Sequence, residues 1–176
     1  MRFRPSLIAI VMLVLVTALA ARPAPGDVAR YVSPAAGPAP AFQEDLAIIV
    51  NKANPIEALT LAELRNVFLA ERSRWPNGRR VTITMLDIGN PEREVVLRTV
   101  YRMREADFNR TFLRARFTGE ATEEPKLLAS PNNMVRFIFN APGAIGYVRA
   151  SSLDGSVKAL RIDGLAPGEP GYRIKL

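Results

Sequence analysis

The side chains best suited to chemistry in this sequence are arginines gathered around its only tryptophan, Trp75. Four of them fall between positions 72 and 80: Arg72, Arg74, Arg79 and Arg80. A guanidinium group carries a fork of donors that fits carboxylates and phosphates, so this segment could dock an anion or an acidic partner. The alternative is a solvated loop in which Trp75 folds back onto the core.

Other residue types argue against catalysis. The chain contains no cysteine and no histidine, which removes thiol nucleophiles, the usual metal ligands and the commonest general base. Glu123 and Glu124 are neighbours in a predicted loop, where adjacent side chains point apart. Ser151 and Ser152 lack a G-x-S-x-G context and a base to activate them. The sequence therefore predicts a protein that is not an enzyme and that needs no cofactor and no metal.

The first residues predict export. Met1–Arg4 is cationic, Leu7–Val16 is apolar, and Ala18–Ala20 has the small residues of a cleavage site, so residues 1–20 are expected to be a signal peptide. The protein is then expected to be periplasmic or secreted, with membrane contact only through this segment. The alternative is an N-terminal anchor that is kept. Residues 21–41, rich in proline and alanine, are expected to form a flexible leader.

The charge is basic but does not by itself indicate nucleic acid. Lysine and arginine number 24 against 17 acidic residues, which gives a net charge of +7, and the basic residues are mostly arginine. No aromatic residues alternate with basic ones in the way of a base-stacking platform, so no nucleic acid is expected as a partner.

One segment, residues 130–148, is predicted to organise the fold as a helix, a tight turn and a buried strand. Ser130 and Pro131 are typical of a helix start, and the apolar stripe is expected to include Phe139. Gly143 is expected to take a positive φ in the turn. Other strands are predicted at residues 46–50, 81–86 and 157–162, and Gly146 is expected where another backbone approaches closely.

The predicted helices alternate with these strands. The capping box of Thr60 and Glu63 starts one helix, Asn90 is the expected N-cap of a second, and a third is expected to carry Phe108, Phe112 and Leu113 inward. This alternation predicts an α/β domain over residues 42–163, with a mostly parallel sheet of four to five strands flanked by helices. Residues 164–176 are expected to be a tail with little fold content.

Several segments in a fixed order resemble the short, single-domain branch of the phosphate-binding-protein-like family, within the type 2 periplasmic binding protein superfamily. The segments include AIIVNKANPIEALTLAELRNVFLAE, WPNGRRVTITMLD, FNRTFLRARFTGE and SPNNMVRFIFNAPGAIGYV. They cover residues 46–163. The resemblance implies a single lobe of the type 2 periplasmic-binding-protein fold.

The resemblance also implies a function and a site. It points to a substrate-binding-like protein of ABC importers, with phosphate or another oxyanion as ligand and an ABC transporter permease or other envelope protein as partner. The turn at which the relatives hold their ligand falls here on Asp87, Gly89, Asn90 and Arg93. The alternative for these residues is a plain strand–turn–helix connection.

A second functional hypothesis is a lobe that binds no ligand and acts as a protein–protein interaction module in the cell envelope. Two features motivate it. The turn from Asp87 to Pro91 lacks the hydroxyl side chains that the family places there, and Pro91 has no N–H to donate. The basic loop of residues 72–80 offers a surface for a partner.

Overall fold

The structure is a computed structural model that describes residues 44–118 and 124–176. The predicted signal peptide of residues 1–20 and the leader of residues 21–41 lie outside the described residues. Within the described part of the chain, no helix is long and apolar enough to span a bilayer.

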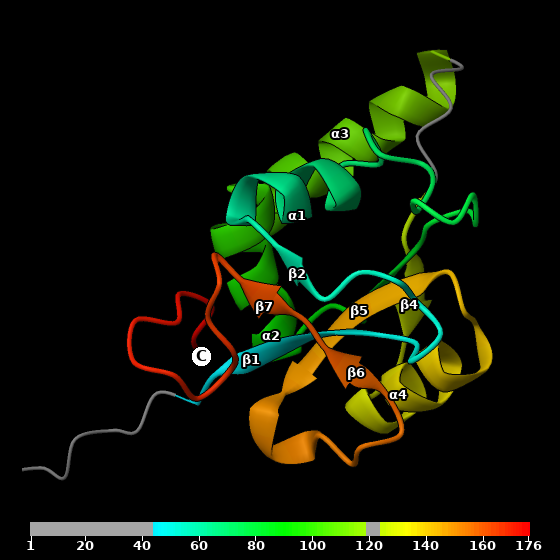
Figure 1. Cartoon of the computed structure of the whole chain (residues 1–176). Helices are drawn as coiled ribbons and strands as arrows, with labels where there is room; N and C mark the ends of the chain where they lie inside the picture. Colours follow the sequence, from blue (N-terminus) through cyan, green and yellow to red (C-terminus); the bar gives the residue numbers. More distant parts are fainter. Residues whose placement is uncertain (1–43, 119–123) are drawn as a thin grey trace, which may run out of the picture. The chain divides into compact units, whose positions relative to one another are not determined.

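The core of the domain is a five-stranded sheet in the order β4-β3-β5-β1-β6 (Figure 1). Its strands are β1 (Leu46–Val50), β3 (Thr82–Leu86), β4 (Lys126–Leu128), β5 (Ala144–Arg149) and β6 (Lys158–Ala159). Strand β5 is central, as expected of a segment whose residues 144–148 are all buried. It pairs with β1 from Leu46↔Arg149 to Val50↔Ile145.

The predicted α/β class is confirmed, but the sheet is mixed rather than mostly parallel. Strand β3 runs parallel to both β4 and β5, whereas β1 runs antiparallel to β5 and to β6. Every residue of β1 is buried, so the strand is apolar on both faces. Such a composition suits a parallel and an antiparallel strand equally well, so it could not predict the direction of β1.

Helices cover both faces of this sheet. They are α1 (Leu61–Phe68), α2 (Pro91–Val96), α3 (Glu105–Thr118) and α4 (Pro131–Asn140), with a π-helical turn, η1, at Leu97–Tyr101. Helix α4 lies on one side of the sheet, and α1, α2 and α3 lie on the other. The capping box of Thr60 and Glu63 starts α1, and the Ser130 hydroxyl accepts a hydrogen bond from the N–H of Asn133 at the start of α4.

Two glycines show how closely α4 and β5 approach their neighbours. A Cβ at Gly146 would collide with the side chains of Thr84, Met134 and Ile138, so close approach is confirmed, although side chains rather than a backbone make it. The expectation of a positive φ at Gly143 is wrong. Gly143 is required instead because a Cβ there would collide with the backbone carbonyl of Arg80.

The predicted strand at residues 157–162 is two short strands in different sheets. Residues 158–159 form β6, and β7 (Arg161–Ile162) pairs in parallel with β2 (Ala58–Leu59) in a separate two-stranded sheet. Leu160 lies between β6 and β7, and its N–H donates to the carbonyl of Ile48. A 3-10 turn, η2 (Ala150–Ser152), follows β5.

The expectation that residues 164–176 have little fold content is wrong. Ile174 is fully buried and its carbonyl accepts a hydrogen bond from the N–H of Leu46, while the Tyr172 hydroxyl donates to the Leu46 carbonyl. The many glycines and prolines of this segment suggested a tail, but composition alone does not show which side chains reach the sheet, and Tyr172 and Ile174 do.

Two apolar side chains expected to face inward are exposed. Leu113 on α3 is 55% exposed, and Phe139 at the end of α4 is 57% exposed.

Candidate functional site

The turn between β3 and α2 contains the residues that the resemblance singled out. Gly89 has a φ of +93°, which closes the turn. Asn90 occupies the N-cap position of α2, and its carbonyl accepts a hydrogen bond from the N–H of Arg93. The Asn90 side chain does not cap the helix, however. Its amide donates to the Asp87 carbonyl at 2.8 Å, so this side chain closes the turn rather than facing a ligand.

Arg93 lies beneath this turn and is only 2% exposed. Its Nε and Nη2 donate to the two carboxylate oxygens of Glu105 at 2.8 and 2.7 Å, and its Nη1 donates to the Leu86 carbonyl at 2.7 Å. Three of its five N–H groups are therefore engaged within the fold. The guanidinium also lies 5.2 Å from the centroid of the Phe108 ring.

The electrostatics of this pair follow from its geometry. Burial alone would lower the pKa of Arg93, but the hydrogen bonds and negative charge of Glu105 outweigh burial and raise it. Those same hydrogen bonds lower the pKa of Glu105. Both groups are charged at neutral pH, and each neutralises the other.

Two buried tyrosines, Tyr101 and Tyr147, lie near Arg93. The Tyr147 hydroxyl accepts a hydrogen bond from the N–H of Leu86 at 3.1 Å, and burial raises its pKa. Tyr101 packs edge-on between Phe68 and Phe108, and its buried hydroxyl has no hydrogen-bond partner among the described residues. Tyr147 thus joins β5 to β3, and Tyr101 packs η1 against α1 and α3.

A small pocket of about 140 Å³ opens beside Arg93. Its walls come from the β3–α2 turn, from α3 and from the start of β4. Most of its lining is apolar, and the polar side chains are Arg93, Asn109 and Glu124. A glutamate at the rim and a guanidinium already paired with Glu105 leave little net positive charge for an anion. No cluster of acidic residues that could hold a metal occurs within the described residues.

The structure places the four predicted site residues close together but assigns them different tasks. Asp87, Gly89 and Asn90 form the turn, and Arg93 points inward to α3. Sequence reasoning missed Glu105, which lies 12 residues after Arg93 and across a π-helical turn. No local sequence pattern predicts this contact. The position of Glu105 relative to Arg93 depends on where the helix ends after η1, at Arg102, whose φ is +57°.

The other residues considered from the sequence have structural partners. The Ser151 hydroxyl donates to the carboxylate of Glu44, and Trp75 is folded onto the core with 2% of its surface exposed. Glu124 lies at the rim of the pocket, and Glu123 lies outside the described residues.

Comparison with known proteins gives one related sequence and several related structures, while no family model matches the chain. The phosphate-binding protein PstS of Bacillus subtilis (strain 168) is 28% identical over 123 residues, which are 69% of this chain and 37% of PstS. The chain therefore spans little more than a third of that relative.

The solved structures agree on the fold. A putative phosphate ABC transporter substrate-binding protein from Clostridium perfringens, solved with bound phosphate, matches with a TM-score of 0.58 and 20% identity, over 70% of this chain and 47% of that one. An ABC-type phosphate transport receptor from Vibrio cholerae matches with a TM-score of 0.60 and 18% identity, over 75% and 54%. The described domain thus has the fold of part of a phosphate ABC transporter substrate-binding protein.

Proposed function

We propose that this chain is a non-enzymatic, exported lobe of the substrate-binding-protein type, and that it works in the cell envelope through protein contacts rather than by holding phosphate at the β3–α2 turn. Its fold, shared with phosphate receptors, is the starting point. The chain matches about half or less of the length of those receptors, so the likeness supports a shared fold over that part alone.

One observation carries the proposal: the guanidinium of Arg93 is committed to Glu105 and to the Leu86 carbonyl. An oxyanion at this turn would compete with a carboxylate that is already bound through two parallel hydrogen bonds. The turn offers no hydroxyl side chain, and the Asn90 amide is bonded to Asp87. Little donor capacity remains for a phosphate.

A second candidate is the function named for the relatives, the binding of phosphate or another oxyanion for an ABC importer. It is favoured by the pocket beside Arg93, where the Nη1 and Nη2 atoms each retain one N–H without a hydrogen-bond partner among the described residues. An anion bound by these two N–H groups would have Arg93 as its charged partner and mostly apolar side chains around it.

Isothermal titration calorimetry distinguishes the two candidates. The full chain would be titrated with inorganic phosphate and with sulfate up to millimolar concentration. The proposal expects no saturable heat with either anion. A saturable heat that is lost in Asn109→Ala, a polar residue of the pocket whose side chain also hydrogen-bonds to Glu105, would favour the oxyanion candidate and overturn the proposal.

A further inference from the structure

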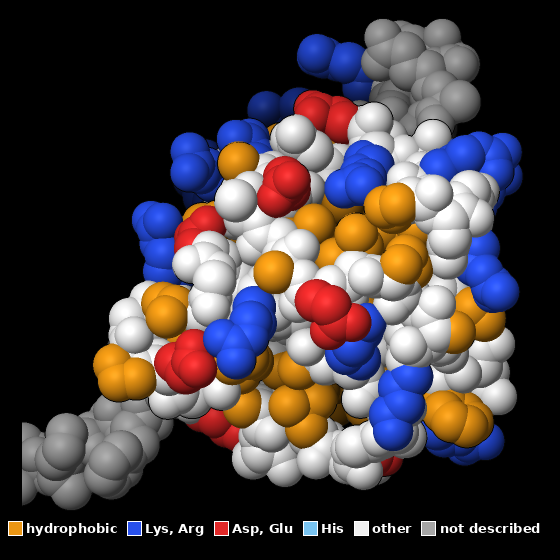
Figure 2. All heavy atoms as spheres, in the orientation of Figure 1, with side chains coloured by type: hydrophobic (Ala, Val, Ile, Leu, Met, Phe, Trp, Pro, Cys, Tyr) orange, Lys and Arg blue, Asp and Glu red, His pale blue; other side chains and the backbone are white. Residues whose placement is uncertain are grey.

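Three large apolar side chains that the described domain exposes lie around the pocket beside Arg93. They are Ile88 of the β3–α2 turn, Leu113 of α3 and Leu127 of β4, and each is more than half exposed. Exposure alone marks no site, because apolar side chains are also exposed on the face drawn in Figure 2. The shared position of these three around one pocket distinguishes them from scattered surface residues.

The pocket has the size of one aromatic ring. Its volume is about 140 Å³, and a protein cavity of about 150 Å³ lined by leucine, isoleucine and phenylalanine side chains binds benzene. The lining here is of the same kind, because Phe108 and Phe112 complete it together with the three exposed side chains. The walls therefore suit a six-membered ring better than a hydrated ion.

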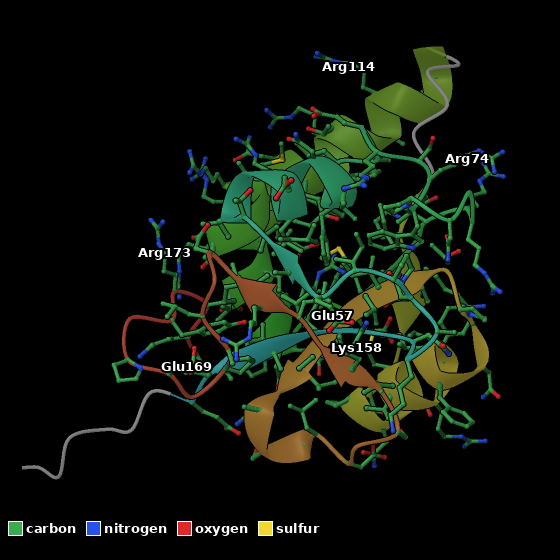
Figure 3. The ribbon with its side chains drawn as sticks, viewed as in Figure 1. Glu57, Arg74, Arg114, Lys158, Glu169 and Arg173 are labelled. Atoms are coloured by element: carbon green, nitrogen blue, oxygen red, sulfur yellow. The ribbon has the colours of Figure 1, made fainter. Side chains whose placement is uncertain are left out.

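Helix α3 gives the pocket a polar end and an apolar end. Glu105, Asn109 and Leu113 follow one another at four-residue spacing, so they lie along one face of the helix. The Asn109 side chain hydrogen-bonds to Glu105, which binds Arg93, so these polar groups share one end. Leu113 lies one turn further along, and Figure 3 shows the next residue, Arg114, extending away from the sheet. The polarity of the lining therefore falls along the helix.

The polar end offers a hydrogen-bond donor and an acceptor. Nη1 and Nη2 of Arg93 each keep one N–H without a partner among the described residues. The Asn109 amide group donates to Glu105, which leaves its carbonyl oxygen as an acceptor. A hydroxyl group complements both, because it accepts and donates. A negative charge suits this end less well, because the Glu105 carboxylate already neutralises the guanidinium and the surroundings are mostly apolar.

The exposed rim indicates a protein as the source of such a ring. One ring fills the pocket but leaves the outer faces of Ile88, Leu113 and Leu127 in water. Apolar residues on either side of a tyrosine in a partner would cover these faces. Tyrosine is enriched at protein interfaces because its ring is apolar and its hydroxyl group is polar. An aromatic side chain held in a pocket is also a common centre of binding energy in an interface.

We propose that the pocket is a docking site for a tyrosine side chain of a partner protein, flanked in the partner by apolar residues. The ring lies against the apolar walls, and its hydroxyl accepts a hydrogen bond from Arg93 and donates one to the Asn109 carbonyl oxygen. This inference rests on the proposed function, because it names the chemistry by which the partner is recognised.

The test is a nuclear magnetic resonance titration of the full chain, labelled with ¹³C in its isoleucine and leucine methyl groups. The probe is the blocked peptide acetyl-Gly-Leu-Tyr-Leu-Gly-amide. We expect saturable shifts in the methyl signals of Ile88, Leu113 and Leu127, each identified by its alanine variant. A phenylalanine version of the peptide should bind at least threefold more weakly, because it lacks the hydroxyl. p-Cresol, the tyrosine side chain alone, should also bind at least threefold more weakly, because it leaves the rim uncovered.

A matched pair of variants locates the site. Leu113→Ala should weaken peptide binding at least threefold, because it removes part of the wall. The control is Phe139→Ala on α4, a side chain that is similarly exposed but does not line this pocket, and it should change the affinity less than twofold. Thermal unfolding of both variants monitors the fold.

Four outcomes would overturn the inference: no saturable shift with the tyrosine peptide, equal binding of the phenylalanine peptide, equal binding of p-cresol, or equal weakening by Leu113→Ala and Phe139→Ala. Equal binding of p-cresol would indicate a free phenol as the occupant. The phosphate titration separates this inference from the proposed function. Absence of peptide binding without any phosphate heat would overturn the inference alone, whereas a phosphate heat that depends on Asn109 would overturn the proposed function.

Discussion

Arg93 and Glu105 are joined by two parallel hydrogen bonds, 2.8 Å from Nε and 2.7 Å from Nη2, that tie the start of α2 to the start of α3. Arg93 is buried, whereas the Glu105 side chain is 32% exposed. The pair makes the guanidinium of Arg93 a structural clamp beneath the β3–α2 turn.

The clamp should make stability depend on pH. The hydrogen bonds from Arg93 lower the pKa of Glu105 below its ordinary value of 4.5, so the folded state binds its proton more weakly than the unfolded state does. The contribution is complete above that ordinary value and is lost as the pH falls through the lowered folded pKa. Urea unfolding of Glu105→Gln between pH 3 and 7 should show a shallower decline toward acid than the unmodified chain. The exposed Glu94→Gln is the control, and an equal change in slope for both variants would contradict the assignment.

Arg93→Ala should destabilise the domain by about 2–4 kcal/mol, because it leaves the Glu105 carboxylate and the Leu86 carbonyl without their partner. The largest losses of stability that follow when a fully buried ion pair is broken are not expected here, because the Glu105 side chain is partly exposed to water. Chemical denaturation would measure the change. Arg110→Ala, at a side chain that is 74% exposed, should alter stability by no more than about 0.5 kcal/mol. Equal effects of the two substitutions would show that Arg93 is not a clamp.

Gly143→Ala should displace the hairpin of residues 73–81, in which Arg74 and Arg80 face each other across an antiparallel bridge. The added methyl group would collide with the Arg80 carbonyl, so the backbone must shift, at a cost of about 1–3 kcal/mol. Trp75 is the only tryptophan, so its fluorescence reports directly on the hairpin and should shift to longer wavelength as water reaches the ring. Asn140→Ala, a nearby exposed position, should leave the emission unchanged. An unshifted spectrum in Gly143→Ala would mean that the hairpin does not depend on this contact.

Ile174→Ala should destabilise the domain by about 2–4 kcal/mol, because the side chain is fully buried next to β1 and its removal leaves a cavity. The neighbouring Arg173→Ala serves as the control, since its side chain is 63% exposed and its ion pair with Asp163 is 3.5 Å long. Thermal unfolding compares the two variants. If Ile174→Ala were as stable as Arg173→Ala, residues 164–176 would be a tail after all.

Much of the fold was predictable because its signals are local. The capping box of Thr60 and Glu63, the cap at Ser130 and the buried run of β1 each depend on residues within a few positions of one another. These local signals gave the α/β class and the central place of β5. The direction of β1 was not predictable, because a strand buried on both faces reads the same in a parallel and an antiparallel pair.

The sequence by itself determined an α/β domain without histidine or cysteine, with a turn at Asp87–Asn90 and a tryptophan among arginines. Only the tertiary structure decided what these residues do. Glu105 binds Arg93 from the far side of a π-helical turn. Gly143 contacts the hairpin of residues 73–81 at the Arg80 carbonyl, although it lies 63 positions after Arg80 in the chain. Such contacts depend on distances that arise when separate elements pack, and no spacing along the chain encodes them.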